Sequence, residues 1–293
     1  MQTRCRAVSN QFFRLLLFLL VAIPAAHASA QEAAPPSQAS DAAYTDLRCH
    51  GLGSNDTDGS LLAKLCEFAL SYHRLLPDFI AQQTTTSRDA RSSTVITAQV
   101  VFREGREYYS QLTINGNPVP TDKASLPRNV RFTSAGEFGS MLVDLFAVPG
   151  TAEFKFRKMA TLQNLPVAIY EFRVPEEKNF FWTISDTNQR TLQPEFRGQV
   201  WLDRATGRPL REELEPIHLP RDWSVSSIKT VTDYAMTKVK DVGTFLLPTR
   251  SESTACIANR SLLNNPCTTN TLVFHDYQKF TTTTRILDAT QEP

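Results

Sequence analysis

Residues 61–87, LLAKLCEFALSYHRLLPDFIAQQTTTS, contain the change of hydrophobic period that decides the fold. In the first part of this stretch, apolar side chains recur every three or four residues, which is the spacing of an amphipathic helix. Pro77 ends that helix, because proline disfavours helical geometry in the residue before it. From Phe79 to Ser87 the period is two, so the stretch predicts a helix that leads directly into a strand.

The rest of the chain continues with a period of two and predicts an antiparallel meander. The strands that we expect cover residues 95–102, 106–114, 153–161, 166–174, 180–185, 196–204, 210–217, 224–238, 243–258 and 271–285. A second helix interrupts them, because Ser134 and Glu137 form a capping box ahead of the helical stripe Phe138, Met141, Leu142 and Leu145. The predicted fold is therefore mainly β (α+β): a single curved antiparallel sheet that forms an unclosed half-barrel, with two or three helices packed on or in its concave face.

The first thirty residues have the pattern of a secretory signal peptide. A lead with three arginines and no acid precedes an apolar run over residues 15–26, and Ala28-Ser29-Ala30 is a small-residue cleavage signature. The apolar run is shorter than the ~20 residues of a bilayer-spanning helix. We therefore expect cleavage after Ala30 and a periplasmic or secreted protein that is not an integral membrane protein.

Three regions of the chain follow from this pattern. Residues 1–30 are the predicted signal peptide, and residues 31–44 are polar and proline-bearing, which predicts a disordered linker. Residues 45–293 show no tandem repeat and no internal boundary, and we expect them to form a single half-barrel-like β domain.

Four cysteines remain after the predicted cleavage: Cys49, Cys66, Cys256 and Cys267. An even number of cysteines in an exported protein predicts disulfides, and three pairings are possible. We favour Cys49–Cys66 and Cys256–Cys267, because each pair is close in sequence and the two pairs lie at opposite ends of the chain. The chain has no cysteine and histidine spacing that is typical of a metal site, so we expect no metal.

The charge of the predicted mature chain is close to neutral. Without the three arginines of the signal peptide, 28 basic residues remain against 30 acidic ones, and the basic residues are scattered. A nucleic-acid partner would require a clustered basic face, so we expect none. The adjacent acids Glu212 and Glu213 point to opposite faces of their strand, and we interpret them as a solvated hairpin end.

The order of the predicted elements, together with four short motifs, resembles the bacterial periplasmic lipoprotein-carrier superfamily, the LolA/LolB-like half-barrels. The motifs are LPDFIAQQ at 76–83, GQVWLD at 198–203, TGRPLR at 206–211 and FLLP at 245–248, and secreted bacterial members of the superfamily share such motifs most closely. The resemblance implies a half-barrel whose concave side binds lipid-modified proteins, other apolar ligands or regulatory partners. It implies no individual site residue.

Aromatic residues on the predicted strands are the candidate ligand contacts. They are Phe102, Phe154, Phe156, Tyr170, Phe172, Trp182 and Trp201, and several share one phase of the alternation. Such residues either fill the core against the helices or line an open groove. The functional hypothesis is a monomeric, non-enzymatic exported protein that binds a lipid-like or apolar ligand, such as an acyl chain or a lipoprotein, in the concave sheet without a cofactor.

Two other functions remain open. One is an envelope protein-interaction or sensor module, whose partner would be another envelope protein. The other is a hydrolase of unknown type, although the chain has no nucleophile elbow, phosphate loop or zinc-protease motif and we expect no catalytic residue. A hydrolase would require His218, or His275 with Asp276, to meet a serine or an acid in one cleft.

Overall fold

The computed structural model describes residues 49, 52, 59–119, 137–138, 140–185, 190–258 and 266–280. The elements are α2 (Gly59–Leu75), β1 (Phe79–Arg88), β2 (Ser93–Arg103), β3 (Arg106–Ile114), β4 (Asn117–Pro118), α3 (Ser140–Ala147), β5 (Glu153–Leu162), β6 (Leu165–Val174), η1 (Glu176–Lys178), β7 (Ile184–Ser185), β8 (Thr191–Leu192), β9 (Phe196–Asp203), β10 (Pro209–Pro216), β11 (Val225–Val239), β12 (Gly243–Ile257) and β13 (Cys267–Lys279). The predicted signal peptide and linker lie outside the described residues. None of the helices in these ranges has the length and apolar character needed to cross a membrane.

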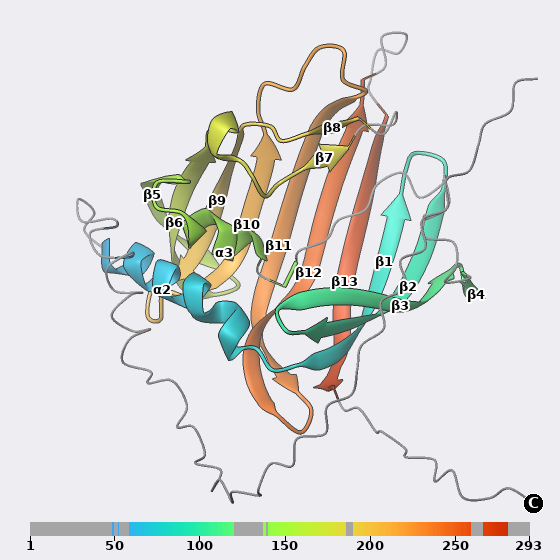
Figure 1. Cartoon of the computed structure of the whole chain (residues 1–293), viewed down its shortest axis with the longest axis horizontal. Helices are drawn as coiled ribbons and strands as arrows, with labels where there is room; N and C mark the ends of the chain where they lie inside the picture. The colour runs from blue at the N-terminus through green and yellow to red at the C-terminus, as the bar shows by residue number, and fades with distance from the viewer. Residues whose placement is uncertain are drawn as a thin grey trace, which may run out of the picture. The chain divides into compact units, whose positions relative to one another are not determined.

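One large antiparallel sheet confirms the predicted fold class (Figure 1). Among the described residues its order is β4-β3-β2-β1-β13-β12-β11-β10-β9-β6-β5, and the two end strands β4 and β5 do not pair with each other. The sheet is therefore unclosed, and most neighbours in space are also neighbours in sequence. There are two exceptions in the described sheet: β6 pairs with β9, and β1 pairs with β13, which joins the first described strand to the last.

The hairpin between β2 and β3 forms at the predicted turn. Glu104 and Gly105 have φ of 53° and 73°, so both turn residues are left-handed, as a two-residue turn of type I′ requires. Asn115 and Gly116, with φ of 48° and 80°, make the next turn in the same way. The two turns fix the register of β2, β3 and β4.

The prediction of a strand over residues 180–185 is wrong for most of its length. Only Ile184 and Ser185 form a strand, and they pair with β8 outside the main sheet. The cause is the buried Asn179, whose side chain donates to the carbonyls of Trp182 and Pro194 at 2.9 and 2.7 Å and accepts from the amide of Trp182 at 2.9 Å. Because a side chain satisfies these backbone groups, the segment forms a loop.

The second helix is shorter than predicted. It begins at Ser140, and Phe138 precedes it. The centroid of the Phe138 ring instead lies within 6.4 Å of the centroids of four other rings, those of Phe79, Phe102, Phe274 and Tyr277. Ser134 of the predicted capping box lies outside the described residues.

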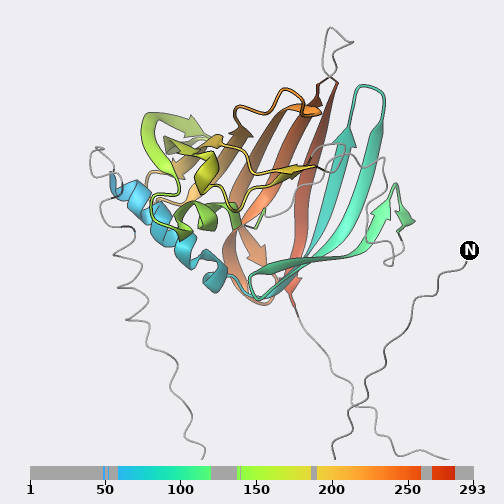
Figure 2. The same ribbon diagram turned by 45° about the horizontal axis from the view of Figure 1, so that its top comes forward.

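The helices α2 and α3 lie on one face of the sheet, which we call the inner face (Figure 2). Side chains of both helices form one buried cluster with β6, β9 and β10, which includes Leu65, Leu142 and Val200. A second cluster joins the end of α2 to β1, β2, β12 and β13, and contains Phe79 and Leu247. A third and smaller cluster forms where the β7–β8 hairpin covers β11 and β12. Most of the core therefore lies between the inner face of the sheet and these segments, whereas the buried Ile169 lies on the opposite face of β6.

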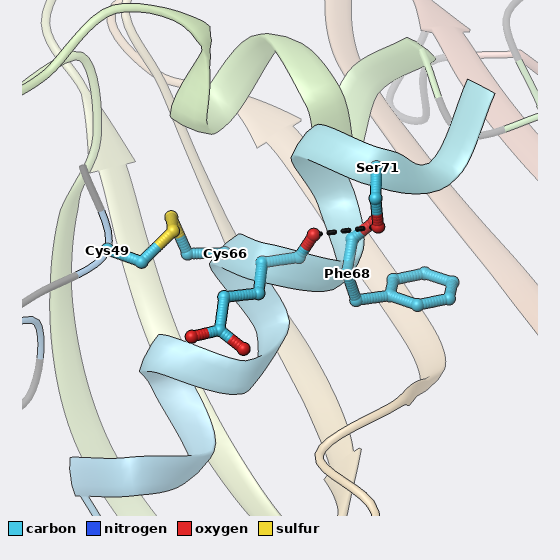
Figure 3. The surroundings of a disulfide bond; sticks show 5 residues. Cys49, Cys66, Phe68 and Ser71 are labelled. Atoms are coloured by element: carbon cyan, nitrogen blue, oxygen red, sulfur yellow. Dashed lines mark hydrogen bonds between the residues drawn. A yellow bond between two sulfur atoms is a disulfide. The ribbon is translucent and has the colours of Figure 1, made fainter. Parts of the chain in front are cut away.

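The two favoured disulfides, Cys49–Cys66 and Cys256–Cys267, are both formed. Figure 3 shows Cys49 joined to Cys66 on α2, where both residues are buried in the first cluster. Cys256 and Cys267 are paired directly across β12 and β13 at the end of their hairpin, where Cys267 is exposed. Disulfides persist in oxidising compartments, so both indicate a protein of the cell envelope or the exterior.

The buried disulfide is expected to stabilise the fold more than the exposed one. The alanine pair at Cys49 and Cys66 removes two buried core groups as well as a cross-link over 17 residues, and should lower the free energy of unfolding by at least ~3 kcal/mol. The alanine pair at Cys256 and Cys267 is the matched control, with a span of 11 residues and an exposed position. Urea unfolding measures both. Equal losses would contradict the expectation.

Candidate functional site

Two rows of side chains cross the inner face from strand to strand, and the register places them in order. The first row reads Phe156, Tyr170, Val200, Glu212, Thr232, Ser251, Leu272 and Thr85. The second row reads Phe154, Phe172, Gly198, Leu214, Thr230, Ser253, Asn270 and Ser87. Both rows start with aromatic rings at the edge of the sheet and become polar in its middle, so the inner face is amphipathic across the strands.

The four rings on β5 and β6 make up the aromatic end of the rows. Phe154 and Phe172 are 5.8 Å apart between ring centroids, and Phe156 and Tyr170 are 5.6 Å apart. Phe146 of α3 stacks on Phe154 at 5.0 Å with the two planes 4° apart. Tyr170 and Phe172 are fully buried core residues, whereas Phe154 and Phe156 are half-buried. The edge strand therefore presents two partly accessible rings beside a packed core.

The other three predicted aromatic contacts lie elsewhere. Phe102 is buried in the second cluster, where it stacks on Phe79 at 5.1 Å. Trp182 belongs to the loop after η1 and packs edge-on against Phe196 at 5.0 Å. Trp201 is paired with Ile169 on the opposite, outer face. The structure thus brings together four of the seven residues, Phe154, Phe156, Tyr170 and Phe172.

The middle of the rows forms a polar centre, which we define as the buried Glu212, Thr232, Ser251 and Ser253 together with the half-buried Thr230. Thr232 and Ser251 share a hydrogen bond of 3.2 Å, and Thr230 and Ser253 share one of 2.9 Å. Both serines are 0% exposed. Sequence reasoning missed this centre because small hydroxyl residues in a strand look the same whether they face solvent or the interior. The one available signal was that Glu212 and Leu214 share a phase.

Glu212 corrects the interpretation of Glu212 and Glu213 as a solvated hairpin end. Glu213 does face outward, where it forms an ion pair with Lys229 at 2.8 Å. Glu212 faces inward and is only 3% exposed. Its Oε2 accepts a long hydrogen bond of 3.4 Å from the hydroxyl of Tyr234, and within the described part of the chain its Oε1 is buried without a partner. Burial raises the pKa of Glu212 to about 8, and the bond from Tyr234 opposes this only in part.

The outer face behind the aromatic end has a hollow of about 620 Å³. Charged side chains of both signs line much of it, and most are compensated. Arg197 pairs with Glu215 at 2.6 Å, and Arg157 approaches Glu171 at 3.4 Å across the neighbouring strands. The pairs are solvated, and such exposed ion pairs contribute little to stability. This surface is a polar outer face without a net charge that would select a ligand.

The hydrolase hypothesis has one geometric candidate. His275 Nδ1 lies 2.7 Å from a carboxylate oxygen of Asp276, and His275 Nε2 lies 3.4 Å from the hydroxyl of Thr84. The side chains of His275 and Asp276 are 47% and 75% exposed, and neither lines the hollow described above. A catalytic triad requires a binding cleft and oxyanion donors beside the nucleophile. Asp276, His275 and Thr84 instead form a hydrogen-bonded series on an exposed surface.

The remaining histidines do not join this hydrogen-bonded series. His218 Nδ1 lies 3.1 Å from Glu195, which also accepts from Arg173, and these bonds lower the pKa of Glu195 although burial opposes them. The ring of His218 is largely exposed at the end of β10. His50 and the side chain of His73 lie outside the described residues. In the same described ranges, no three histidine, cysteine or acidic side chains gather in a way suited to a metal ion.

Comparisons with known proteins find similarity of structure alone. No protein-family model and no curated protein matches the sequence. A LolA superfamily protein from Nitrosomonas europaea has a TM-score of 0.38 and 12% identity, over 78% of this chain and 95% of that one. A putative outer membrane lipoprotein-sorting protein domain from Vibrio parahaemolyticus has a TM-score of 0.38 and 13% identity, over 73% of this chain and 90% of that one. A DUF1329 family protein from Desulfovibrio piger has a TM-score of 0.37 and 7% identity, over 79% of this chain and 95% of that one.

The resemblance expected from the sequence is thus found as a structural similarity to LolA superfamily, lipoprotein-sorting and DUF1329 proteins at low identity.

Proposed function

We propose that the protein is an exported, non-enzymatic binding protein that holds the apolar chain of a lipid-like ligand against the aromatic end of the inner face. The observation that supports this most directly is the difference in burial along the rows. Tyr170 and Phe172 are closed within the core, while Phe154 and Phe156 stay half-buried on the neighbouring strand. Half-buried rings that continue a packed apolar core are suited to extend it over a ligand.

Access from the side supports the same proposal. β5 is the last strand of the sheet, so no further strand covers its free edge within the described residues. Phe146 of α3 stacks on Phe154, so α3 and β5 form the two sides of this region. Exposed apolar side chains flank it on three elements: Val148 after α3, Met159 on β5 and Phe180 after η1. Exposed apolar residues grouped around a concave surface are typical of ligand-binding and interaction sites.

The proposal predicts a selective effect of Phe156→Ala. The change removes a half-buried ring from the aromatic end, and the lost apolar contact of ~1.5–3 kcal/mol should weaken acyl binding by about ten- to a hundredfold. Trp201→Ala is the matched control, because Trp201 is equally half-buried but lies on the outer face. Native mass spectrometry with a fluorescent acyl probe measures binding, and urea unfolding measures stability.

The outcomes separate the functions. Loss of probe binding in Phe156→Ala but not in Trp201→Ala, at similar stability, supports the apolar-ligand function. Binding that is the same in both variants would place the ligand elsewhere. A wild-type protein that retains no lipid from its native envelope and binds no acyl probe would overturn the proposal in favour of an envelope protein partner.

A further inference from the structure

We propose that Cys256–Cys267 is a site of reversible thiol–disulfide exchange in the folded protein, and that the molecule that reacts with it is a dithiol protein. Cys49–Cys66 is shielded from the same reaction until the fold opens. The inference goes beyond the proposed function and does not depend on it, because the exchange site lies on β12 and β13 and the aromatic end lies on β5 and β6.

The two disulfides differ in how accessible they are to a thiol. Cys267 is exposed and Cys256 is half-buried at the ends of their strands. Cys49 and Cys66 are each 1% exposed and belong to the first buried cluster. Exchange begins when a thiolate reaches a disulfide sulfur, so access decides which of the two bonds reacts in the native state. The difference selects Cys256–Cys267, and within that bond it selects Cys267 as the residue whose sulfur is attacked.

The register places this disulfide on the outer face of the hairpin. Cys256 and Cys267 are paired directly across β12 and β13, and they share the phase of Thr254 and Thr269. The neighbouring Ala255 has the opposite phase and belongs to the third buried cluster, on the inner face. The segments that cover the core, α2, α3 and the β7–β8 hairpin, pack against that inner face. A protein can therefore approach the disulfide from the outer face without displacing any of these segments.

The strands around the disulfide have other contacts that hold them together. Beyond the bond, the amide of Ile257 donates to the carbonyl of Pro266 at 2.9 Å. Before it, the hydroxyls of Thr254 and Thr269 share a hydrogen bond of 2.9 Å. We therefore expect the hairpin to stay paired after reduction, with the two thiols opposite each other. Groups held together in this way react at a high effective concentration, so the bond can form again when the reductant is removed.

The exchange proceeds in two steps. A thiolate of the dithiol protein attacks Sγ of Cys267, which forms a mixed disulfide, and Cys256 leaves as a thiolate that takes up a proton. The second thiolate of the dithiol protein then attacks its own sulfur in the mixed disulfide, and Cys267 leaves as a thiolate that is protonated in turn. Two electrons thus pass to the cysteine pair, and the dithiol protein becomes the disulfide. The reverse sequence restores Cys256–Cys267.

Differential reduction tests the access. The full mature protein is incubated without denaturant with dithiothreitol or with reduced thioredoxin, the free thiols are alkylated, and the cysteine peptides are quantified by mass spectrometry. We expect Cys256–Cys267 to be reduced at least about a hundredfold faster than Cys49–Cys66, which reacts only through a minor open state. In urea above the unfolding midpoint the two rates should become similar. Equal rates in the folded protein, or reduction of Cys256–Cys267 in urea alone, would overturn the proposal.

A trapping experiment identifies the attacked sulfur. Thioredoxin that lacks its second active-site cysteine cannot complete the exchange, so it should remain joined to Cys267 as a mixed disulfide. Peptide mass spectrometry locates the adduct. An adduct at Cys256 would overturn the assignment of Cys267, and the absence of any adduct would overturn a dithiol protein as the reacting molecule.

Reoxidation tests whether the exchange is reversible. After the reductant is removed, Cys256 and Cys267 should pair with each other again, and the urea midpoint should return to that of the untreated protein. Pairing of either residue with Cys49 or Cys66, or loss of the β-sheet circular dichroism signal on reduction, would contradict a reversible site. These measurements use no acyl probe, so their failure would leave the proposed function standing.

Discussion

The stability of Glu212→Gln relative to the wild type is expected to rise with pH, by about 3 kcal/mol between pH 4 and pH 7 and by about 5 kcal/mol between pH 4 and pH 9. The reason is the buried carboxyl, whose pKa rises from an ordinary 4.5 to about 8 in the folded protein. Glutamine has nearly the same shape, cannot ionise, and can still accept the hydrogen bond that Tyr234 donates to Oε2.

The direction of the pH dependence follows from the protons bound in each state. Below pH 4.5 the carboxyl is protonated whether the chain is folded or unfolded, so it contributes no pH dependence. Between pH 4.5 and 8 only the folded state keeps the proton, so stability falls as the pH rises, by about 1.4 kcal/mol for each unit. Above pH 8 the loss is complete and the dependence on this group ends.

Urea unfolding of the wild type and Glu212→Gln at pH 5, 7 and 9 measures this. The difference between the two proteins should grow from pH 5 to pH 9. Glu213→Gln is the matched control, because the neighbouring carboxyl faces outward, where it is paired with Lys229. Parallel profiles for the wild type and Glu212→Gln would mean that the buried carboxyl is not as isolated as its surroundings indicate.

Gly198→Ala is expected to be the most damaging single change in the sheet, with a loss of about 3 kcal/mol or more. A methyl group at this position would lie 2.2 Å from Cζ of Phe172 and 2.3 Å from the backbone oxygen of Glu213. The ring of Phe172 occupies the space that every other residue in the row fills with its own side chain. Because a ring and a backbone oxygen are both confined by the sheet, neither can move away cheaply.

The test is urea unfolding of Gly198→Ala against Gln199→Ala, which lies next to it on the outer face. Gln199→Ala should cost less than about 1 kcal/mol, since its side chain makes only a 3.3 Å bond to Glu171. Combining Gly198→Ala with Phe172→Ala should be less damaging than the sum of the two single changes, because the ring no longer blocks the methyl group. Strict additivity would show that the backbone contact alone sets the cost.

Much of the fold could be predicted from the sequence because its signals are local. The change of period at Pro77, the turn at Glu104 and Gly105, and the favoured disulfide pairs all depend on neighbours along the chain, and all are confirmed. The strand predicted at 180–185 is wrong because the amide side chain of Asn179 bonds to backbone groups far along the loop. Neither the composition nor the hydrophobic period of the segment indicates that bond.

The site was harder to predict because the role of each residue in it depends on which face of the sheet that residue occupies. Trp201 and Ile169 are apolar residues on the outer face, so an apolar pattern did not separate the two sides of β6 and β9. Likewise, Glu212 and Glu213 are the same residue type. Only the pairing of Glu212 with Thr232 and Val200 shows which of the two is buried. Register across several strands is a long-range property, and it is what assembles the aromatic end and the polar centre.

The pairing of β1 with β13 has a consequence for how the chain reaches its folded state. The first strand finds its second neighbour only in Cys267–Lys279, the last strand of the sheet, so the N-terminal hairpins cannot dock until nearly the whole chain is present. Contacts this distant in sequence slow folding, because loop closure must precede them. This topology therefore leaves the β1 edge of the N-terminal hairpins without its second neighbour until β13 has been synthesised.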